Sequence, residues 1–269
     1  YMSIGTAATN IAMAAEALGL PYKREVGLGN DGAPFAVFRF GSLEAHPDPS
    51  TDMQLKAILT RHNNRSSFTG GTIPSNVLEH ISSEVVRYGL GVTLVTDQSK
   101  ISQVKELLGQ AAYTAFEDKK FTQELAAWVK PSFPWYTEGL PGYSMHLPWV
   151  ISLLLPFAVR FKDMRALQQK IHEGFMTSVS GIGVLTVPVE TAEHLEEAGE
   201  CFERIAVYLE ANEIKLGVMQ ALIEVKGFRE QLQALLSIKE VPILFFRMGY
   251  STTRPKTSPR RSLRAFLNT

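Results

Sequence analysis

An internal repeat is the feature that most constrains the fold of this chain. Two helix-like segments that start 194 positions apart share residues at matching places. Each is followed by a spacer and a short strand-like motif, Phe38-Arg39-Phe40-Gly41 in one case and Phe246-Arg247-Met248-Gly249 in the other. The matched helical residues are Gly5, Ile11, Ala12, Glu16 and Ala17, followed 194 positions later by Gly199, Ile205, Ala206, Glu210 and Ala211. Chance similarity of two amphipathic helices is the alternative, but the paired strand motifs favour two related halves.

The repeat suggests a division of the chain. Residues 1–44 are expected to form the C-terminal part of a first half whose N-terminal part is missing. Residues 45–52 contain two prolines and two aspartates and are predicted to be a linker. Residues 53–269 are expected to form the second half. Within it, the proline-rich, apolar segment at about 130–160 is interpreted as a lid-like insertion.

Hydrophobic periodicity predicts many helices and few strands, which indicates an α+β fold. The expected helices cover 3–20, 53–60, 75–87, 101–129 (as one helix or a pair), 163–175, 191–215 and 228–236. The expected strands cover 35–40, 91–96, 183–189 and 241–248. Residues 131–156 are predicted to be loop-rich. For the apolar run 147–159, a buried irregular segment is favoured over a membrane contact, and a flap over a cavity is a third interpretation.

Composition excludes several classes of protein. The 269 residues are 45% apolar, which is typical of a globular chain and argues against disorder. Lys plus Arg and Asp plus Glu both number 27, so the basic excess of a general nucleic-acid binder is absent. The longest apolar run, 147–159, is shorter than the ~20 residues of a membrane span. With Cys201 as the only cysteine, a disulfide within the chain is impossible, and a reducing, cytoplasmic location is predicted.

Familiar catalytic motifs are missing. The six histidines are not at metal-ligand spacing, and no metal site is expected. The sequence contains no nucleophile elbow, dinucleotide-binding glycine motif or phosphate-binding loop of the Walker type. Cys201 falls on the expected buried side of a helix, so it is predicted to be structural. No catalytic residue is therefore assigned.

Two basic clusters remain as candidate binding residues. One is Arg61-His62-Asn63-Asn64-Arg65, and the other is in the C-terminal tail with Arg260 and Arg261. Guanidinium groups suit phosphate oxygens, so the two clusters could share one phosphate. Spacing alone favours the simpler interpretation that both are solvated surface charge.

The ordered set of motifs resembles the nitroreductase-like flavoprotein family. The segment 61–65, with Phe68 and Ile73-Pro74 after it, is similar to that family's N-terminal FMN-gripping element. Residues 246–250, with Ser258-Pro259-Arg260-Arg261 after them, are similar to its closing element. Two halves in one chain look like the Acg-type tandem nitroreductases, in which the repeat mimics a homodimer. Asn63 stands where the family usually has Ser or Thr, and the element that lines the flavin from the other half is absent.

The resemblance implies an FMN-binding oxidoreductase that transfers hydride from NAD(P)H to nitro- or quinone-like acceptors. The cofactor-binding residues that it implies are Arg61, His62, Asn63, Arg65, Met219, Gln220, Arg260 and Arg261. It also implies a pseudo-dimeric monomer or a homodimer, with neither nucleic acid nor membrane as a partner. One alternative is a non-catalytic protein that binds or sequesters flavin under a closed lid. Another is the nitroreductase-like C-terminal part of a longer multidomain protein.

Overall fold

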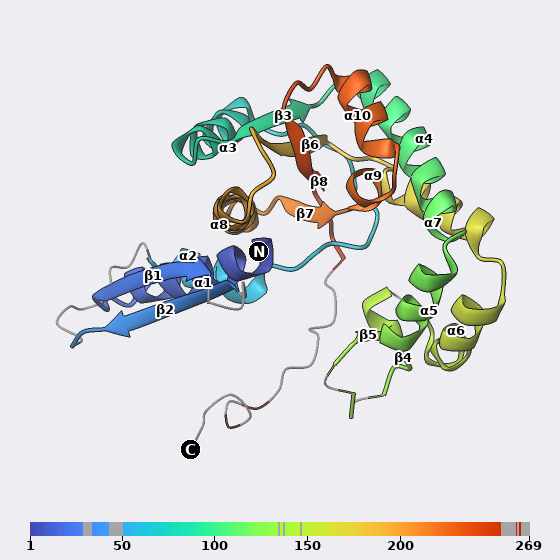
Figure 1. Cartoon of the computed structure of the whole chain (residues 1–269), viewed down its shortest axis with the longest axis horizontal. Helices are drawn as coiled ribbons and strands as arrows, with labels where there is room; N and C mark the ends of the chain where they lie inside the picture. Colours follow the sequence, from blue (N-terminus) through green and yellow to red (C-terminus); the bar gives the residue numbers. More distant parts are fainter. Residues whose placement is uncertain are drawn as a thin grey trace.

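The computed structural model describes residues 1–28, 34–42, 51–133, 135–136, 138–145, 147–253, 262 and 264 (Figure 1). Its centre is a four-stranded sheet in the order β3-β6-β8-β7, and every neighbouring pair is antiparallel. The strands are β3 (Gly91–Val95), β6 (Gly181–Val187), β7 (Lys215–Val218) and β8 (Val241–Gly249). An antiparallel sheet combined with many helices confirms the predicted mixture of helix and sheet.

Helices cover both faces of this sheet. On one face, α3 (Ser75–Arg87) and α8 (Ala192–Ala211) share a core with Leu185, Val187 and Phe246. On the other face are α4 (Gln98–Ala115), α9 (Ala221–Glu224) and α10 (Phe228–Leu236). Because it is covered on both sides, every residue of β6 is buried. This double burial explains why β6 is apolar in sequence apart from Thr186.

The N-terminal helix α1 (Met2–Ala17) packs along α8 through two glycines. A Cβ atom on Gly5 would lie 2.1 Å from the Glu196 carbonyl oxygen, and one on Gly199 would lie 2.1 Å from the Met2 carbonyl oxygen. Met2 and Glu196, like Gly5 and Gly199, are 194 positions apart. The two contacts are therefore equivalent under the sequence repeat. Helix α2 (Thr51–Thr60) packs against both α1 and α8.

A hairpin of β1 (Tyr22–Leu28) and β2 (Pro34–Phe40) follows α1 and projects from the body of the molecule (Figure 1). Its register matches that of β7 and β8. Lys23 pairs with Arg39 in the hairpin, and Gly217 pairs with Arg247 in the central sheet. Gly217 follows Lys23 by 194 positions, and Arg247 is the arginine that corresponds to Arg39 in the second Phe-Arg-x-Gly motif. The hairpin therefore has the same local topology as β7–β8.

The residues between α4 and α7 (Arg165–Phe175) in the sequence form a separate lobe, and the elements of this lobe pack mainly on one another (Figure 1). It contains α5 (Lys119–Trp128), β4 (Val129–Lys130), β5 (Leu140–Pro141), the 3-10 helix η1 (Gly142–Met145) and α6 (Trp149–Phe161). The prediction of a buried irregular segment is wrong here, because α6 is a helix with Trp149 and Leu154 exposed at 62% and 66%. Pro148 stands at its N-cap, where no backbone N–H is needed, and Pro156 lies inside it.

Some predicted bounds of helices and strands are confirmed and others are wrong. The segment 101–129 forms two helices, α4 and α5, and Gly19 follows α1 with a φ of 63°, as expected for a helix stop. Strands β1 and β7 were not predicted, and the helix expected over 191–215 ends at Ala211. Residues 45–50 of the predicted linker lie outside the described residues, and α2 already begins at Thr51.

Candidate functional site

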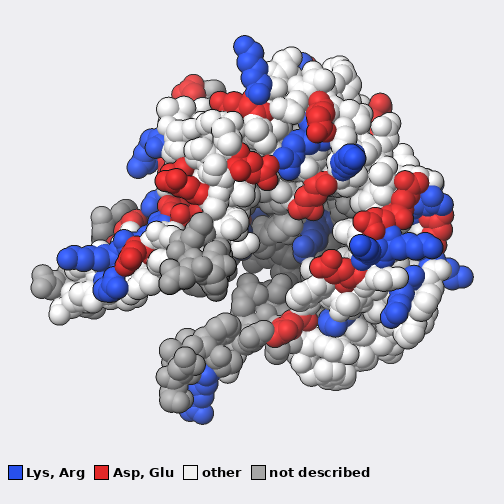
Figure 2. Space-filling model, viewed as in Figure 1, with Lys and Arg blue, Asp and Glu red and all other residues white. Residues whose placement is uncertain are grey.

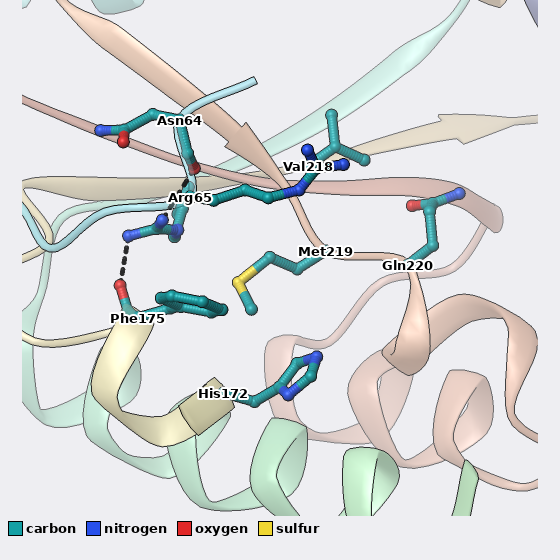
Figure 3. Close-up of a pocket in the computed structure, with 8 residues that line it drawn as sticks. Asn64, Arg65, His172, Phe175, Val218, Met219 and Gln220 are labelled. Carbon is teal, nitrogen blue, oxygen red and sulfur yellow. Dashed lines mark hydrogen bonds between the residues drawn. The ribbon is translucent and has the colours of Figure 1, made fainter. Parts of the chain in front are cut away.

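A cavity of about 180 Å³ lies beside the C-terminal end of β7 (Figure 3). The loop after α2, the last turns of α7, the end of β7 and strand β8 supply its walls. The lining residues are Asn64, Arg65, His172, Phe175, Val218, Met219, Gln220 and Arg247. A whole small-molecule pocket usually measures ~300–1,000 Å³, so this cavity suits one part of a larger ligand.

The loop after α2 is held against the edge of β7 by hydrogen bonds. The Asn63 side-chain oxygen accepts one from the Val218 N–H at 2.7 Å, and the Asn64 N–H donates to the Leu216 carbonyl at 2.8 Å. The Asn64 side-chain oxygen accepts a further bond from the Ser66 N–H at 2.8 Å, which closes a tight turn around Arg65. Residue 63 therefore fixes the loop, and residues 64 and 65 line the cavity.

Arg65 carries a positive charge into the cavity wall. Its side chain is partly buried, and no acidic residue in the described part of the chain forms an ion pair with it. Burial lowers the pKa of its guanidinium below its usual range. Beside it, the Asn64 side-chain nitrogen is buried and has no partner among the described residues. These are two donors suited to oxygen atoms of a ligand.

Arg247 lies behind the cavity with 1% of its surface exposed. Its Nη2 donates to the carbonyls of Asn64 and Ser66, each at 2.9 Å, and its Nη1 donates to the carbonyl of Phe175. The guanidinium also stacks 4.5 Å from the centre of the Phe68 ring. Burial lowers its pKa to about 10. Because these hydrogen-bond acceptors are neutral, they do not cancel its charge.

His172 brings an acceptor to the same cavity. Its Nδ1 lies 2.9 Å from the Gln168 carbonyl, which can only accept, so Nδ1 carries the proton and Nε2 keeps a lone pair. Burial lowers the pKa of His172 below 6.5, and the nearby Arg247 charge lowers it further. The imidazole is therefore neutral at pH 7. Figure 3 shows its ring below Met219 at the floor of the site.

Two predicted residues at the end of β7 have different positions in the site. The side chain of Met219 is buried against the cavity. The Gln220 amide holds strand β8, since its nitrogen donates to the Ile243 carbonyl and its oxygen accepts from the Phe245 N–H, both at 3.1 Å. The backbone N–H of Met219 also bonds to the Phe245 carbonyl at 3.0 Å. Gln220 thus shapes the wall while its amide is occupied on both sides.

Among the other predicted residues that the structure describes, Arg61 and His62 do not line the cavity. Arg61 directly follows α2 and lies 2.7 Å from the buried carboxylate of Glu203 on α8. Burial raises the pKa of Glu203, and Arg61 opposes that shift. His62 donates from Nδ1 to the Thr60 carbonyl at 3.0 Å, and its Nε2 is buried with no partner among the described residues. Arg260 and Arg261 lie outside the described residues.

Sequence reasoning missed His172, Phe175 and Arg247 as lining residues. His172 and Phe175 stand a helical step apart on α7, but one histidine on a helix is a weak signal. Arg247 belonged to the repeated motif, and an arginine within an apolar strand was the available signal. Its partners are remote in the sequence, so its role could not be inferred from its neighbours.

Other chemical groups point away from alternative reactions. Cys201 is buried, as predicted, and burial raises the pKa of its thiol to about 12, which suppresses the nucleophilic thiolate. Across the described ranges, no three His, Cys, Asp or Glu side chains form a group able to hold a metal ion. In the same part of the chain, no helix has the length and apolar character needed to cross a bilayer.

Comparison with known proteins identifies the fold. No protein-family model matches the chain, and no curated protein matches it. Among solved structures, it is similar to an FMN-dependent nitroreductase from Mycobacterium smegmatis determined in complex with NADPH. The TM-score is 0.52 at 14% identity, covering 82% of this chain and 99% of the other.

A nitroreductase with bound FMN from Desulfitobacterium hafniense gives a TM-score of 0.51 at 13% identity, covering 81% of this chain and 97% of the other. Identities this low establish architecture alone. The chain therefore has the nitroreductase fold, built from mixed helix and sheet. The family resemblance in the sequence and the similarity in structure agree at this level.

Proposed function

We propose that this chain binds FMN and works as a nitroreductase-type oxidoreductase. In this proposal it transfers hydride from NAD(P)H, through the flavin, to a nitro- or quinone-like acceptor in ping-pong fashion. The observation that carries the proposal is a cavity in a nitroreductase fold whose wall contains an arginine, Arg65, without an acidic partner among the described residues. The flavin would supply the redox chemistry, and the protein would bind and orient it.

The donors around the cavity fit an oxygen-rich, anionic ligand. Arg65 and the unpartnered Asn64 amide nitrogen offer N–H groups, and Arg247 adds a positive charge behind them. His172 offers an acceptor for a ring N–H. We propose that Arg65, Asn64 and Met219 hold the flavin. The predicted contacts of Arg61, His62, Asn63, Gln220, Arg260 and Arg261 with FMN stay predictions.

We also propose that the chain is a tandem repeat that forms its own pseudo-dimer. The equivalent glycine contacts of α1 and α8 support it, because each half offers the same surface to the other, as in a two-fold interface. The matching registers of β1–β2 and β7–β8 support it independently. In this proposal one FMN lies between the halves.

A titration tests FMN binding directly. Flavin fluorescence should fall as the purified chain is added, and Arg65→Ala should weaken the affinity at least about tenfold, as expected for one charge-assisted hydrogen bond. Arg229→Ala is the control, because Arg229 is likewise a partly buried arginine but lies outside the cavity, where it bonds the Ile223 carbonyl and Glu190. Equal affinities of the wild type and Arg65→Ala would refute the assigned site.

Stopped-flow mixing with NADPH separates the enzyme from a flavin-sequestering protein. The exposed apolar residues of α6 favour considering a lid, since such a face could close over bound flavin. Rapid bleaching of the bound flavin supports the oxidoreductase. Bound flavin that stays oxidised would support the closed-lid alternative.

A further inference from the structure

We propose that Arg247 is a positioning residue, whose guanidinium holds the loop 64–66 and the end of α7 so that Arg65 points into the cavity. The identity of the ligand that Arg65 meets rests on the proposed function, whereas the coupling of the two segments does not. Arg247 itself does not need to contact that ligand.

The hydrogen bonds of Arg247 bracket Arg65. Nη2 donates to the carbonyls of residues 64 and 66, which precede and follow Arg65 in the chain, each at 2.9 Å. Two fixed carbonyls on either side leave the intervening residue little freedom in φ and ψ. The direction in which the Arg65 side chain leaves the backbone is thereby set from behind the cavity.

The same guanidinium reaches a second wall of the site. Nη1 donates to the carbonyl of Phe175, and Phe175 is the last residue of α7. A cation at this position satisfies a carbonyl that has no partner within the helix and interacts favourably with the helix dipole. Since His172 and Phe175 lie on that last stretch of α7, Arg247 links them to the Arg65 loop.

Neighbouring residues pack closely around this guanidinium. A Cβ atom at Gly217, on the neighbouring strand, would lie 2.9 Å from Arg247 Nε and 2.6 Å from the Asn64 carbonyl oxygen. Phe68 covers one face of the guanidinium plane at 4.5 Å. Lysine has a single nitrogen and no planar fork, so it could not bond all three carbonyls in this geometry.

Hydrogen exchange of the ligand-free chain tests the coupling. In Arg247→Lys, peptides covering residues 61–68 and 169–178 should exchange about tenfold faster, as expected for the loss of roughly one charge-assisted hydrogen bond in each segment. Peptides from α10 should be unchanged. The matched control is Arg39→Lys, which changes the exposed arginine at the equivalent motif position. Unchanged exchange in both site peptides would overturn the proposal.

A double-mutant cycle tests whether the effect passes through Arg65. Introduced into the wild-type chain, Arg247→Lys should weaken FMN binding about tenfold. Introduced into the Arg65→Ala variant, the same substitution should change FMN affinity little. Equal losses in both backgrounds would contradict a positioning role. If the wild type binds no FMN, the proposed function fails, while the exchange experiment still decides the coupling.

A second variant covers the case in which Arg247→Lys does not fold. Gly217→Ala keeps every charge but places a methyl group against the Asn64 carbonyl and the guanidinium. It should reproduce the faster exchange of residues 61–68 and the loss of FMN affinity. Wild-type exchange and affinity in this variant would contradict the proposed packing.

Discussion

The two Phe-Arg-x-Gly motifs occupy the same register and have opposite environments. Arg39 on β2 has 66% of its side chain exposed and forms an ion pair with Glu25 at 3.2 Å, whereas Arg247 on β8 is 1% exposed and bonds three backbone carbonyls. The strand pairing is the same, so it does not explain the difference. The loop 64–66 and α7 cover β8 and have no counterpart over the described part of the hairpin.

A repeated motif thus fixes the position of an arginine on its strand, while the segments packed on that strand decide whether the arginine is buried or exposed. A buried arginine with neutral partners keeps its charge near a cavity, and an exposed arginine loses much of its influence to water and salt. On the face shown in Figure 2, basic and acidic side chains are interspersed, as expected for a chain without net charge. The charge of Arg247, by contrast, lies inside the fold beside the cavity.

The largest expected effect concerns the two arginines themselves. Arg247→Met should lower the free energy of unfolding by about 2–4 kcal/mol, because three carbonyls lose a buried donor. Arg39→Met should change it by less than ~0.5 kcal/mol, as is usual at an exposed position. Urea unfolding of both variants checks this. Similar losses of unfolding free energy in the two variants would contradict the difference inferred between the two arginines.

The glycine contacts test the proposed equivalence of two halves. Gly5→Ala and Gly199→Ala should each cost about 1–3 kcal/mol, because each new methyl group meets a carbonyl oxygen of the opposite helix. Gly174→Ala on α7 is the control, since a Cβ there has nothing within 4 Å. It should leave stability unchanged or raise it slightly. A harmless substitution at only one of the two contact glycines would contradict the equivalence.

His172 should make the Arg247 side of the comparison sensitive to pH. Its pKa is lower in the folded chain than the ordinary 6.5, so the unfolded chain binds the proton more readily. Its contribution to stability is complete above about pH 6.5 and is lost as the pH falls through and below that value. The raised pKa of Glu203 acts with the opposite sign, so the difference between wild type and His172→Gln is the readout.

Urea midpoints of wild type and His172→Gln between pH 8 and 5 measure this difference. The wild type should lose more stability than the variant as the pH falls. Parallel curves would show that the His172 environment has been misjudged.

The smallest effect is expected at the exposed ion pair. Glu25→Gln should change the free energy of unfolding by less than ~0.5 kcal/mol, and added salt should remove even that. Thermal unfolding at low and high salt measures it. A loss above 1 kcal/mol would mean that the hairpin arginine, too, has a structural role.

Sequence patterns predicted the elements that bury one clear apolar stripe or run. Helices α1, α3 and α8 and strands β6 and β8 were found because tertiary packing and local periodicity agree in them. Strand β1 was missed because Lys23, Arg24 and Glu25 interrupt its apolar pattern, and Arg24 meets Glu196 and Glu200 on α8. Strand β7 is only four residues long.

The site was predictable in part. Arg65, Met219 and Gln220 were predicted from the family resemblance, and all three line the cavity. Helix α6 was hidden because its two prolines suggest a loop, although Pro148 is harmless at the helix start. The contribution of Arg247 depends on carbonyls at positions 64, 66 and 175, and no local pattern encodes contacts over such separations.

The visible absorbance spectrum of the purified chain incubated with FMN and then freed of unbound flavin is the most direct test of the central claim. We predict a yellow protein that releases about one FMN molecule per chain on heating. We also predict that Arg65→Ala retains much less flavin under the same treatment. A colourless wild-type chain would contradict flavin binding and leave a nitroreductase fold without its cofactor.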